Sequence, residues 1–94
     1  FLTGDFNAQG GDKSLKPLGS YLQEAAGTVK KADKTPSFND FGRKGGKPAS
    51  IDHILYRNAE ARSFYVIDEP KFGVKYISDH YPVISEFVIK IPKD

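Results

Sequence analysis

The order of apolar and polar residues along the 94-residue chain predicts several short strands and one helix. Residues 1–3 are apolar or β-branched, and they predict a strand that runs directly into the sequence Gly-Asp-Phe-Asn. Residues 12–26 carry apolar side chains at helical spacing and predict a helix, with Asp12 or Ser14 as its cap and Gly27 as its stop. The apolar stripe of this helix is interpreted as core packing rather than a cofactor site, and it consists of Leu15, Leu18, Leu22 and Ala25.

Three later segments also have the patterns of strands. The sequence SIDHILYRN, residues 50–58, is largely apolar on both faces and predicts a strand that is covered on both sides. Residues 63–68, SFYVID, predict a further strand. The segment YPVISEFVIKI, residues 81–91, alternates and predicts a strand with one buried face. Its expected inward side chains are Val83, Phe87, Ile89 and Ile91, and its expected outward ones are Glu86 and Lys90.

Residues 27–50 are rich in Gly, Pro, Lys and Asp and predict a long loop, with a short strand around residues 37–41. Long loops are often functional, so two interpretations remain open. The loop is either a solvated basic surface or an element that helps to dock an anionic substrate. Its basic residues are Lys30, Lys31, Lys34, Arg43, Lys44 and Lys47.

Composition limits the classes of protein to consider. A hydrophobic content of 38% with 28% charged residues is typical of one folded domain and not of a disordered chain. The net charge of +2 tolerates an anionic partner without requiring one, and no apolar run is long enough to span a membrane. The absence of Cys excludes disulfides and thiolate zinc sites, but it leaves the cellular compartment open. Because Phe1 stands in the middle of a predicted strand, we expect residues upstream to be missing.

Three short stretches carry candidate chemistry: GDFN at residues 4–7, IDHI at 51–54 and SDHYP at 78–82. Phosphoryl transfer needs a group that orients water, donors for the phosphate oxygens and a cation that offsets the developing charge. Asp, Asn, His and a divalent metal supply these functions. Each stretch also has a structural interpretation, because the first can form an Asx turn and the third can cap the last strand.

Asp52 is the most informative of these residues. Its carboxylate interrupts an apolar strand, where an unpaired charge is costly to bury, and a histidine is the expected partner. Such a pair fixes the tautomer of the imidazole and favours its charged form, although a purely structural ion pair is an equally open interpretation. His53 points to the opposite face and is interpreted as a packing residue.

The three stretches, in this order and separated by about 45 and about 25 residues, resemble the C-terminal part of the endonuclease/exonuclease/phosphatase superfamily. This superfamily includes pancreatic deoxyribonuclease, abasic-site repair endonucleases, bacterial sphingomyelinases and inositol-polyphosphate 5-phosphatases. The resemblance implies an α+β fold that is part of a four-layer α/β/β/α sandwich, to which this chain contributes mainly one mixed or antiparallel sheet and a helix. Residues 1–94 would form the C-terminal half of the domain, with the N-terminal half absent.

The resemblance also implies roles for five residues. Asp5 would activate or orient the attacking water, and Asn7 would hydrogen-bond a phosphate oxygen. Asp79 would bind the divalent cation, expected to be Mg²⁺ with Mn²⁺ as a substitute, since the ligands are hard oxygens. His80 would contact the scissile phosphate as an imidazolium, and Asp52 would hold that imidazole.

The resemblance implies that further site residues lie outside this chain. In the superfamily, an Asn and a Glu that ligate the metal and a second active-site His come from the N-terminal half, and none has a counterpart here. The isolated chain is therefore expected to be inactive, with the missing half or a second chain covering its exposed sheet. The implied substrate is a phosphate ester in a nucleic acid, a phospholipid headgroup or an inositol phosphate, and Phe41, Tyr81 and residues 43–47 are candidate recognition elements.

Two other functions remain open at this point. The first is a non-catalytic phosphate-binding or interaction module of the same fold, in which the phosphate pocket serves as a docking surface. The second is an unrelated small α+β binding domain with chance motifs. The second of these requires Asp5, Asn7, Asp79 and His80 to be scattered in space.

Overall fold

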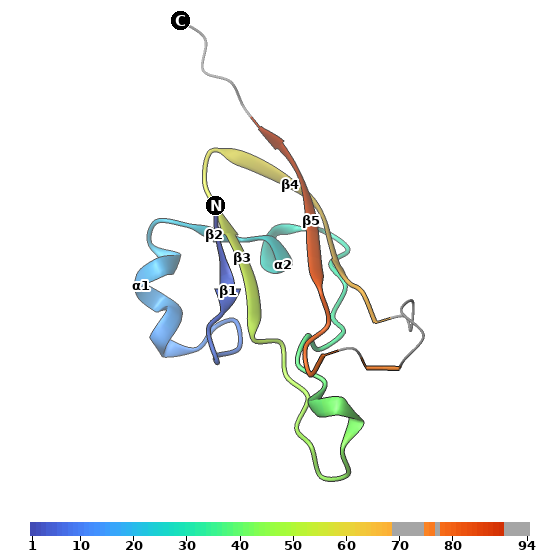
Figure 1. Ribbon diagram of the computed structural model, residues 1–94. Coiled ribbons are helices and arrows are strands. Elements are labelled where there is room, and N and C mark those ends of the chain that lie inside the picture. Colours follow the sequence, from blue (N-terminus) through green and yellow to red (C-terminus); the bar gives the residue numbers. More distant parts are fainter. Residues whose placement is uncertain (69–74, 77, 90–94) are drawn as a thin grey trace, which may run out of the picture.

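The computed structural model describes residues 1–68, 75, 76 and 78–89 of the chain. They form an α+β structure of antiparallel strands with short helical turns (Figure 1). Among these residues, no helix has both the length and the apolar character that a membrane crossing requires. The elements in chain order are β1 (Leu2–Asp5), the 3₁₀ turn η1 (Lys13–Leu15), α1 (Lys16–Gly19), β2 (Gln23–Glu24), α2 (Ala25–Thr28), the 3₁₀ turn η2 (Asp40–Gly42), β3 (Asp52–Tyr56), β4 (Ala59–Val66) and β5 (Val83–Ile89).

The described strands form two antiparallel sheets, where mainly one mixed or antiparallel sheet was expected. One sheet has the order β1-β3-β2, and the other pairs β4 with β5. In the first sheet, Leu2 lies opposite Leu55 and Asp5 lies opposite Asp52, so β3 is flanked on both sides. In the second sheet the register shifts between Ala61 and Ser63. The α+β fold class is confirmed.

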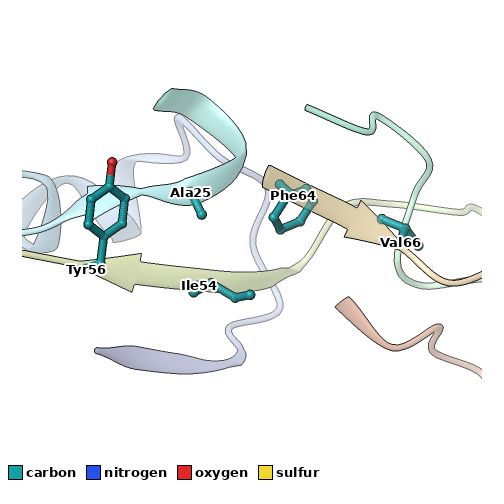
Figure 2. Packing of buried hydrophobic residues seen from close by; sticks show 5 residues of the cluster. All are labelled: Ala25, Ile54, Tyr56, Phe64 and Val66. Atoms are coloured by element: carbon teal, nitrogen blue, oxygen red, sulfur yellow. The ribbon is translucent and has the colours of Figure 1, made fainter. Parts of the chain in front are cut away.

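The core lies where α2 and β4 cover β3. Five buried hydrophobic side chains form the core cluster there. Figure 2 shows that Ala25 of α2 and Phe64 of β4 lie beside β3. The hydroxyl groups of Tyr56 and Thr28 lie 2.6 Å apart, which satisfies the polar end of a nearly buried tyrosine. Phe87 of β5 packs its ring against Tyr56 at a centroid distance of 4.9 Å. The cluster consists of Ala25, Ile54, Tyr56, Phe64 and Val66.

The prediction of one helix over residues 12–26 is wrong. The segment breaks into η1, α1 and β2, and α2 continues through Gly27 to Thr28. Asp12 does cap the first turn, with its carboxylate accepting from the backbone N–H of Ser14. The physical reason for the break is that Gln23 and Glu24 pair with β3, and a helix this short gains little from propensity alone.

The remaining sequence predictions agree with the structure more closely. Strand β3 is half-buried at Asp52 and buried over the next four residues, as expected of a strand that is covered on both sides. Around residues 37–41 there are isolated bridges at Phe38 and the turn η2 instead of a regular strand. On β5, Val83 and Phe87 are half-buried and Glu86 is exposed as predicted, but Ile89 is 63% exposed. The prediction for residues 90–91 falls outside the described residues.

The apolar stripe predicted for residues 12–26 is divided between two places. Ala25 is fully buried in the core, whereas Leu15, Leu18 and Leu22 are half-buried. These three leucines line a shallow groove together with Leu55 of β3. The expectation of core packing therefore holds fully only for Ala25.

Replacing Phe64 with Ala is expected to lower the free energy of unfolding by about 3–5 kcal/mol, because a buried aromatic ring is lost and a cavity remains. Phe64 is only 5% exposed, whereas the next residue, Tyr65, points outward and is 54% exposed. Tyr65→Ala is therefore a matched control and should change the free energy by about 0.5 kcal/mol or less. Urea unfolding followed by circular dichroism measures both, and equal effects would contradict the assigned core.

Candidate active site

The register of β1 and β3 places two carboxylates at one end of the first sheet. Asp5 is the last residue of β1 and Asp52 is the first residue of β3, and the two lie directly opposite each other. Side chains of directly opposed residues lie on the same face of an antiparallel pair. Two like charges in this position are unfavourable unless a positive group lies between them.

His80 supplies the group that faces both carboxylates. Its Nδ1 donates to Asp52 Oδ2 at 2.7 Å, and its Nε2 lies 3.6 Å from Asp5 Oδ2. One ligand atom from each of the three residues lies within 4.8 Å of the other two. Residues separated by 75 positions in the chain are thus gathered in one cluster. The expected contact between Asp52 and a histidine is present, and Asp5 and His80 lie together rather than scattered.

The turn after β1 directs the carboxylate of Asp5 toward His80. Asp5 Oδ1 accepts from the backbone N–H of Asn7 at 2.9 Å, which leaves Oδ2 to face the imidazole. Asn7 has a φ of 51°, a left-handed conformation that asparagine tolerates better than most residues. The Asx turn and the site geometry therefore occur together, and the side chain of Asn7 is exposed to solvent beside them.

Asp79 lies next to the cluster but does not belong to it. Its side chain is half-buried, and its backbone carbonyl accepts from the N–H of Asn39 at 2.7 Å. The hydroxyl of Ser78 donates to Oδ1 of Asp79 at 3.5 Å. The structure thus brings together Asp5, Asp52 and His80 and leaves Asp79 at the edge of the site.

The carboxylates favour the charged form of His80. The hydrogen bond to Asp52 raises the pKa of the imidazole above its ordinary value of 6.5, and partial burial opposes this shift. The negative charges of Asp52, Asp5 and Asp79 raise the same pKa further. The net direction is upward, so the site favours an imidazolium that can donate from Nε2.

The stability of the chain should therefore depend on pH through His80. A histidine with a raised pKa in the folded state stabilises the fold fully at a pH below its unfolded value of 6.5, and this contribution is lost as the pH rises through the folded value. We expect the wild-type free energy of unfolding to fall more steeply above pH 6.5 than that of His80→Gln. Urea titrations at a series of pH values measure both slopes, and parallel curves would contradict the assigned shift.

His53 lies on the other face of β3, as predicted. Its side chain is buried, its Nε2 donates to the carbonyl of Ala8 at 2.6 Å, and its Nδ1 lies 2.5 Å from Glu24 Oε1. The ring of Phe6 stacks on it at a centroid distance of 5.5 Å. The interpretation as a packing residue is confirmed, and Glu24 is a partner that the sequence did not indicate.

Sequence reasoning also missed two polar residues behind the site. Ser37 and Asn39 are only 2% and 6% exposed, and they contact the segments that carry Asp52 and His80. Both lie in the segment around which a short strand was expected. The only available signal was that they flank Phe38 in alternation, which is typical of strand-like backbone.

The carboxylate oxygens at the site are the kind of ligand that a hard divalent cation binds. The carboxylates in the cluster belong to Asp5 and Asp52, and that of Asp79 lies at its edge. Mg²⁺ prefers oxygen ligands and commonly binds through one or two carboxylates with retained waters and substrate phosphate oxygens. The residues present therefore fit such an ion, with Asp79 as the ligand assigned from the sequence.

Two solved structures resemble this chain. One is a functionally unknown conserved protein from Enterococcus faecalis V583, with 20% identity, a TM-score of 0.77 and coverage of 95% of this chain and 36% of the other. The second is the endonuclease/exonuclease/phosphatase from Bacteroides vulgatus, with 21% identity, a TM-score of 0.75 and coverage of 94% and 35%. The chain has the endonuclease/exonuclease/phosphatase fold. The resemblance stated from the motifs is confirmed at the level of the fold.

The chain spans about a third of the length of both proteins with this fold, at 36% and 35%. No family model and no curated protein matches it.

The candidate recognition elements of this fold differ in accessibility. Phe41 is 43% exposed at the tip of η2, and the guanidinium of Arg43 lies 5.3 Å from the centre of its ring. Lys44 and Lys47 are exposed in the same loop, which extends away from the strands in Figure 1. Tyr81 instead packs against the core cluster, so it is less available to a substrate.

Proposed function

We propose that this chain forms part of a divalent-metal-dependent hydrolase of phosphate esters. The observation that carries the proposal is the placement of His80 between two carboxylates, with Nδ1 held by Asp52 and Nε2 directed toward Asp5. Such a site combines a group that can orient water with a cationic donor for phosphate oxygens, which are two central requirements of phosphoryl transfer.

The proposed division of labour follows from these positions. The carboxylate of Asp5, whose side chain is 39% exposed, accepts a hydrogen bond from the attacking water and orients it toward phosphorus. His80 donates from Nε2 to a phosphate oxygen, and Asp52 fixes the ring through Nδ1. The exposed amide of Asn7 donates to a second phosphate oxygen. A divalent cation held by Asp79 would offset the negative charge that develops on the phosphate.

We further propose that residues 1–94 form the C-terminal half of a longer domain. Two observations support this: the chain covers only about a third of each similar structure, and the cluster found among the described residues offers only Asp5, Asp52 and His80 to a metal. The N-terminal half, or a second chain, would supply the remaining ligands and cover apolar side chains that are exposed here, among them Ile84 and Val88 of β5. A complete site then requires both parts.

The substrate class is a phosphate ester in a nucleic acid, a phospholipid headgroup or an inositol phosphate. The exposed loop with Phe41 and three basic residues, Arg43, Lys44 and Lys47, suits any of these anions. A panel of plasmid DNA, sphingomyelin and inositol polyphosphates, offered to the longer protein, separates the three.

The direct test uses bis-p-nitrophenyl phosphate with Mg²⁺ and the longer protein that contains this chain. Turnover that depends on Mg²⁺ and is lost in His80→Ala supports the proposed hydrolase. The 94-residue chain alone is expected to hydrolyse no faster than its own His80→Ala variant. Binding of phosphate esters by the longer protein without turnover would instead favour the non-catalytic module and overturn the hydrolase.

A further inference from the structure

A short segment lies between the two parts of the chain that carry Asp52 and His80. We call residues 37–39 the bridging segment. Isolated antiparallel bridges place Phe38 opposite Ala49 on one side and opposite His80 on the other. The ring of Phe38 also lies against the ring of His80, with centroids 5.3 Å apart at an interplanar angle of 58°. The bridging segment thus contacts the segment that leads to Asp52 and the segment that carries His80.

Ser37 contacts the start of β3 through its side chain. Its Oγ accepts from the backbone N–H of Ile51 at 3.3 Å and from that of Asp52 at 3.2 Å. The carbonyl of the same residue accepts from the N–H of Tyr81, the residue after His80, at 2.7 Å. Ser37 is only 2% exposed, so solvent is poorly placed to replace these bonds.

Asn39 contacts the segment before His80 in a complementary way. Its Nδ2 donates to the carbonyl of Ser78 at 3.1 Å, and its backbone N–H donates to the carbonyl of Asp79 at 2.7 Å. Its Oδ1 accepts from the N–H of Phe41 at 2.7 Å, which fixes the side chain in one orientation. At 6% exposure, every polar group of this side chain is used within the protein.

We propose that Ser37 and Asn39 are positioning residues that set the geometry of the Asp52–His80 pair. Ser37 holds the backbone of Asp52, and Asn39 holds the backbone of residues 78–79, so the two side chains meet at a fixed distance. The inference rests on the proposed function for its effect on turnover, but its structural part concerns this chain alone.

The number and placement of the hydrogen bonds distinguish positioning from general stabilisation. Five of them join the bridging segment to residues within two positions of Asp52 or His80. A displacement of about 1 Å in a reacting group can lower a rate by about 100-fold, even when the fold is retained. Loss of either side chain should therefore affect the Asp52–His80 pair more than it affects the fold.

The test compares Ser37→Ala and Asn39→Asp with a control, Thr28→Val. Ser37→Ala removes the acceptor for two backbone amides, and Asn39→Asp removes the donor to Ser78 while it keeps the acceptor for Phe41. Thr28→Val also removes side-chain hydrogen bonds, to Glu24 and Tyr56, but on α2 and away from His80. Urea unfolding of all three gives the loss of stability that each change causes.

The structural readout is imidazole NMR of the 94-residue chain, which contains only two histidines. His80→Gln assigns the signals, and the proton on His80 Nδ1 reports the bond to Asp52. We expect Ser37→Ala and Asn39→Asp to shift or abolish this proton signal. The NMR signals of the His53 ring should stay at their wild-type positions. Thr28→Val should leave the His80 signals at their wild-type positions, even if it lowers the free energy of unfolding as much as Ser37→Ala or Asn39→Asp does. Wild-type His80 signals in both site variants would overturn the inference.

The functional readout is turnover by the longer protein. We expect kcat to fall by about 10- to 100-fold in both variants with KM little changed, since substrate contacts are kept and geometry is lost. Wild-type kcat in both variants would also overturn the inference. Absence of any hydrolysis by the wild-type protein would overturn the proposed function instead, and the NMR comparison would still decide whether Ser37 and Asn39 position the pair.

Discussion

Asn in place of Asp5 is expected to lower kcat of the longer protein by about 10³-fold, within the range that a positioned acid or base contributes. The change removes the negative charge that faces His80 Nε2 and that is proposed to orient the attacking water. An asparagine side chain still offers an oxygen to the N–H of Asn7, so the turn after β1 should be retained. The free energy of unfolding should change by only about 0.5 kcal/mol. Initial rates with bis-p-nitrophenyl phosphate and Mg²⁺ measure the effect.

Asp12→Asn is the matched control for this prediction. Asp12 makes the same local bond as Asp5, since its Oδ1 accepts from the N–H two residues later at 2.9 Å. It caps η1 and does not belong to the cluster of Asp5, Asp52 and His80. Asp12→Asn should therefore retain wild-type kcat. Equal losses in the two variants would show that the effect comes from the turn and not from the site.

The part of the site that could be predicted from the sequence is the part that lies on strands. Residues 1–3 and 50–58 have strand patterns, and the observed strands Leu2–Asp5 and Asp52–Tyr56 lie at these places. The pairing of Asp5 with Asp52 is visible only in the structure. Asp52 could be singled out because a carboxylate in an apolar strand needs a partner. The residue alone indicated only that this partner is a histidine, and the family resemblance then implied His80.

The failed helix prediction has a specific physical cause. The apolar spacing of residues 12–26 fits a helix locally, but Gln23 and Glu24 gain backbone hydrogen bonds by pairing with β3. Glu24 also places its carboxylate against the buried ring of His53. Contacts between residues 29 positions apart leave no trace in a local pattern of hydrophobic residues. Tertiary contacts of this kind commonly override weak helix propensity.

The bridging segment was unpredictable for a related reason. Ser37 and Asn39 lie in a stretch whose composition indicates a loop, and their partners are backbone groups, which any sequence possesses. When a side chain bonds to a backbone group, its partner can be any residue type. The sequence therefore contains no particular residue that would reveal the bond. Only the fold shows that these two polar residues are nearly buried and that they bond to the segments that carry Asp52 and His80.

Strand β3 carries two imidazole–carboxylate pairs on its opposite faces. Asp52 holds His80 on one face, and the next residue, His53, contacts Glu24 on the other. The first pair is partly accessible and lies beside Asp5, whereas the ring of the second is buried and bonded at both nitrogens. On one face of β3, an imidazole–carboxylate pair belongs to the proposed active site. On the other face, His53 bonds to Glu24 of β2 and to Ala8 in the turn after β1.

Asn in place of Asp52 is expected to lower kcat of the longer protein by about 10²- to 10⁴-fold, by analogy with other carboxylates that orient a working histidine. Asp52 Oδ2 accepts from His80 Nδ1 at 2.7 Å, and this bond is the main cause of the raised pKa of His80. Without the carboxylate, the ring loses its fixed orientation and its pKa falls toward the ordinary value of 6.5. Activity that depends on an imidazolium is lost as the pH rises through this pKa. The descending limb of the kcat profile should therefore move to lower pH in Asp52→Asn.

Glu24→Gln provides the matched control, because it alters the other imidazole–carboxylate pair on the same strand. This change weakens the contact with His53 and should lower the free energy of unfolding, but it leaves Asp52 and His80 in place. We expect Glu24→Gln to keep wild-type kcat and the wild-type descending limb in assays well below its unfolding temperature. If Asp52→Asn lost activity with no change in the position of that limb, the carboxylate would act on the reaction by a route other than the charge of His80. A loss of kcat in Glu24→Gln as large as in Asp52→Asn would instead assign the effect of both pairs to the stability of β3.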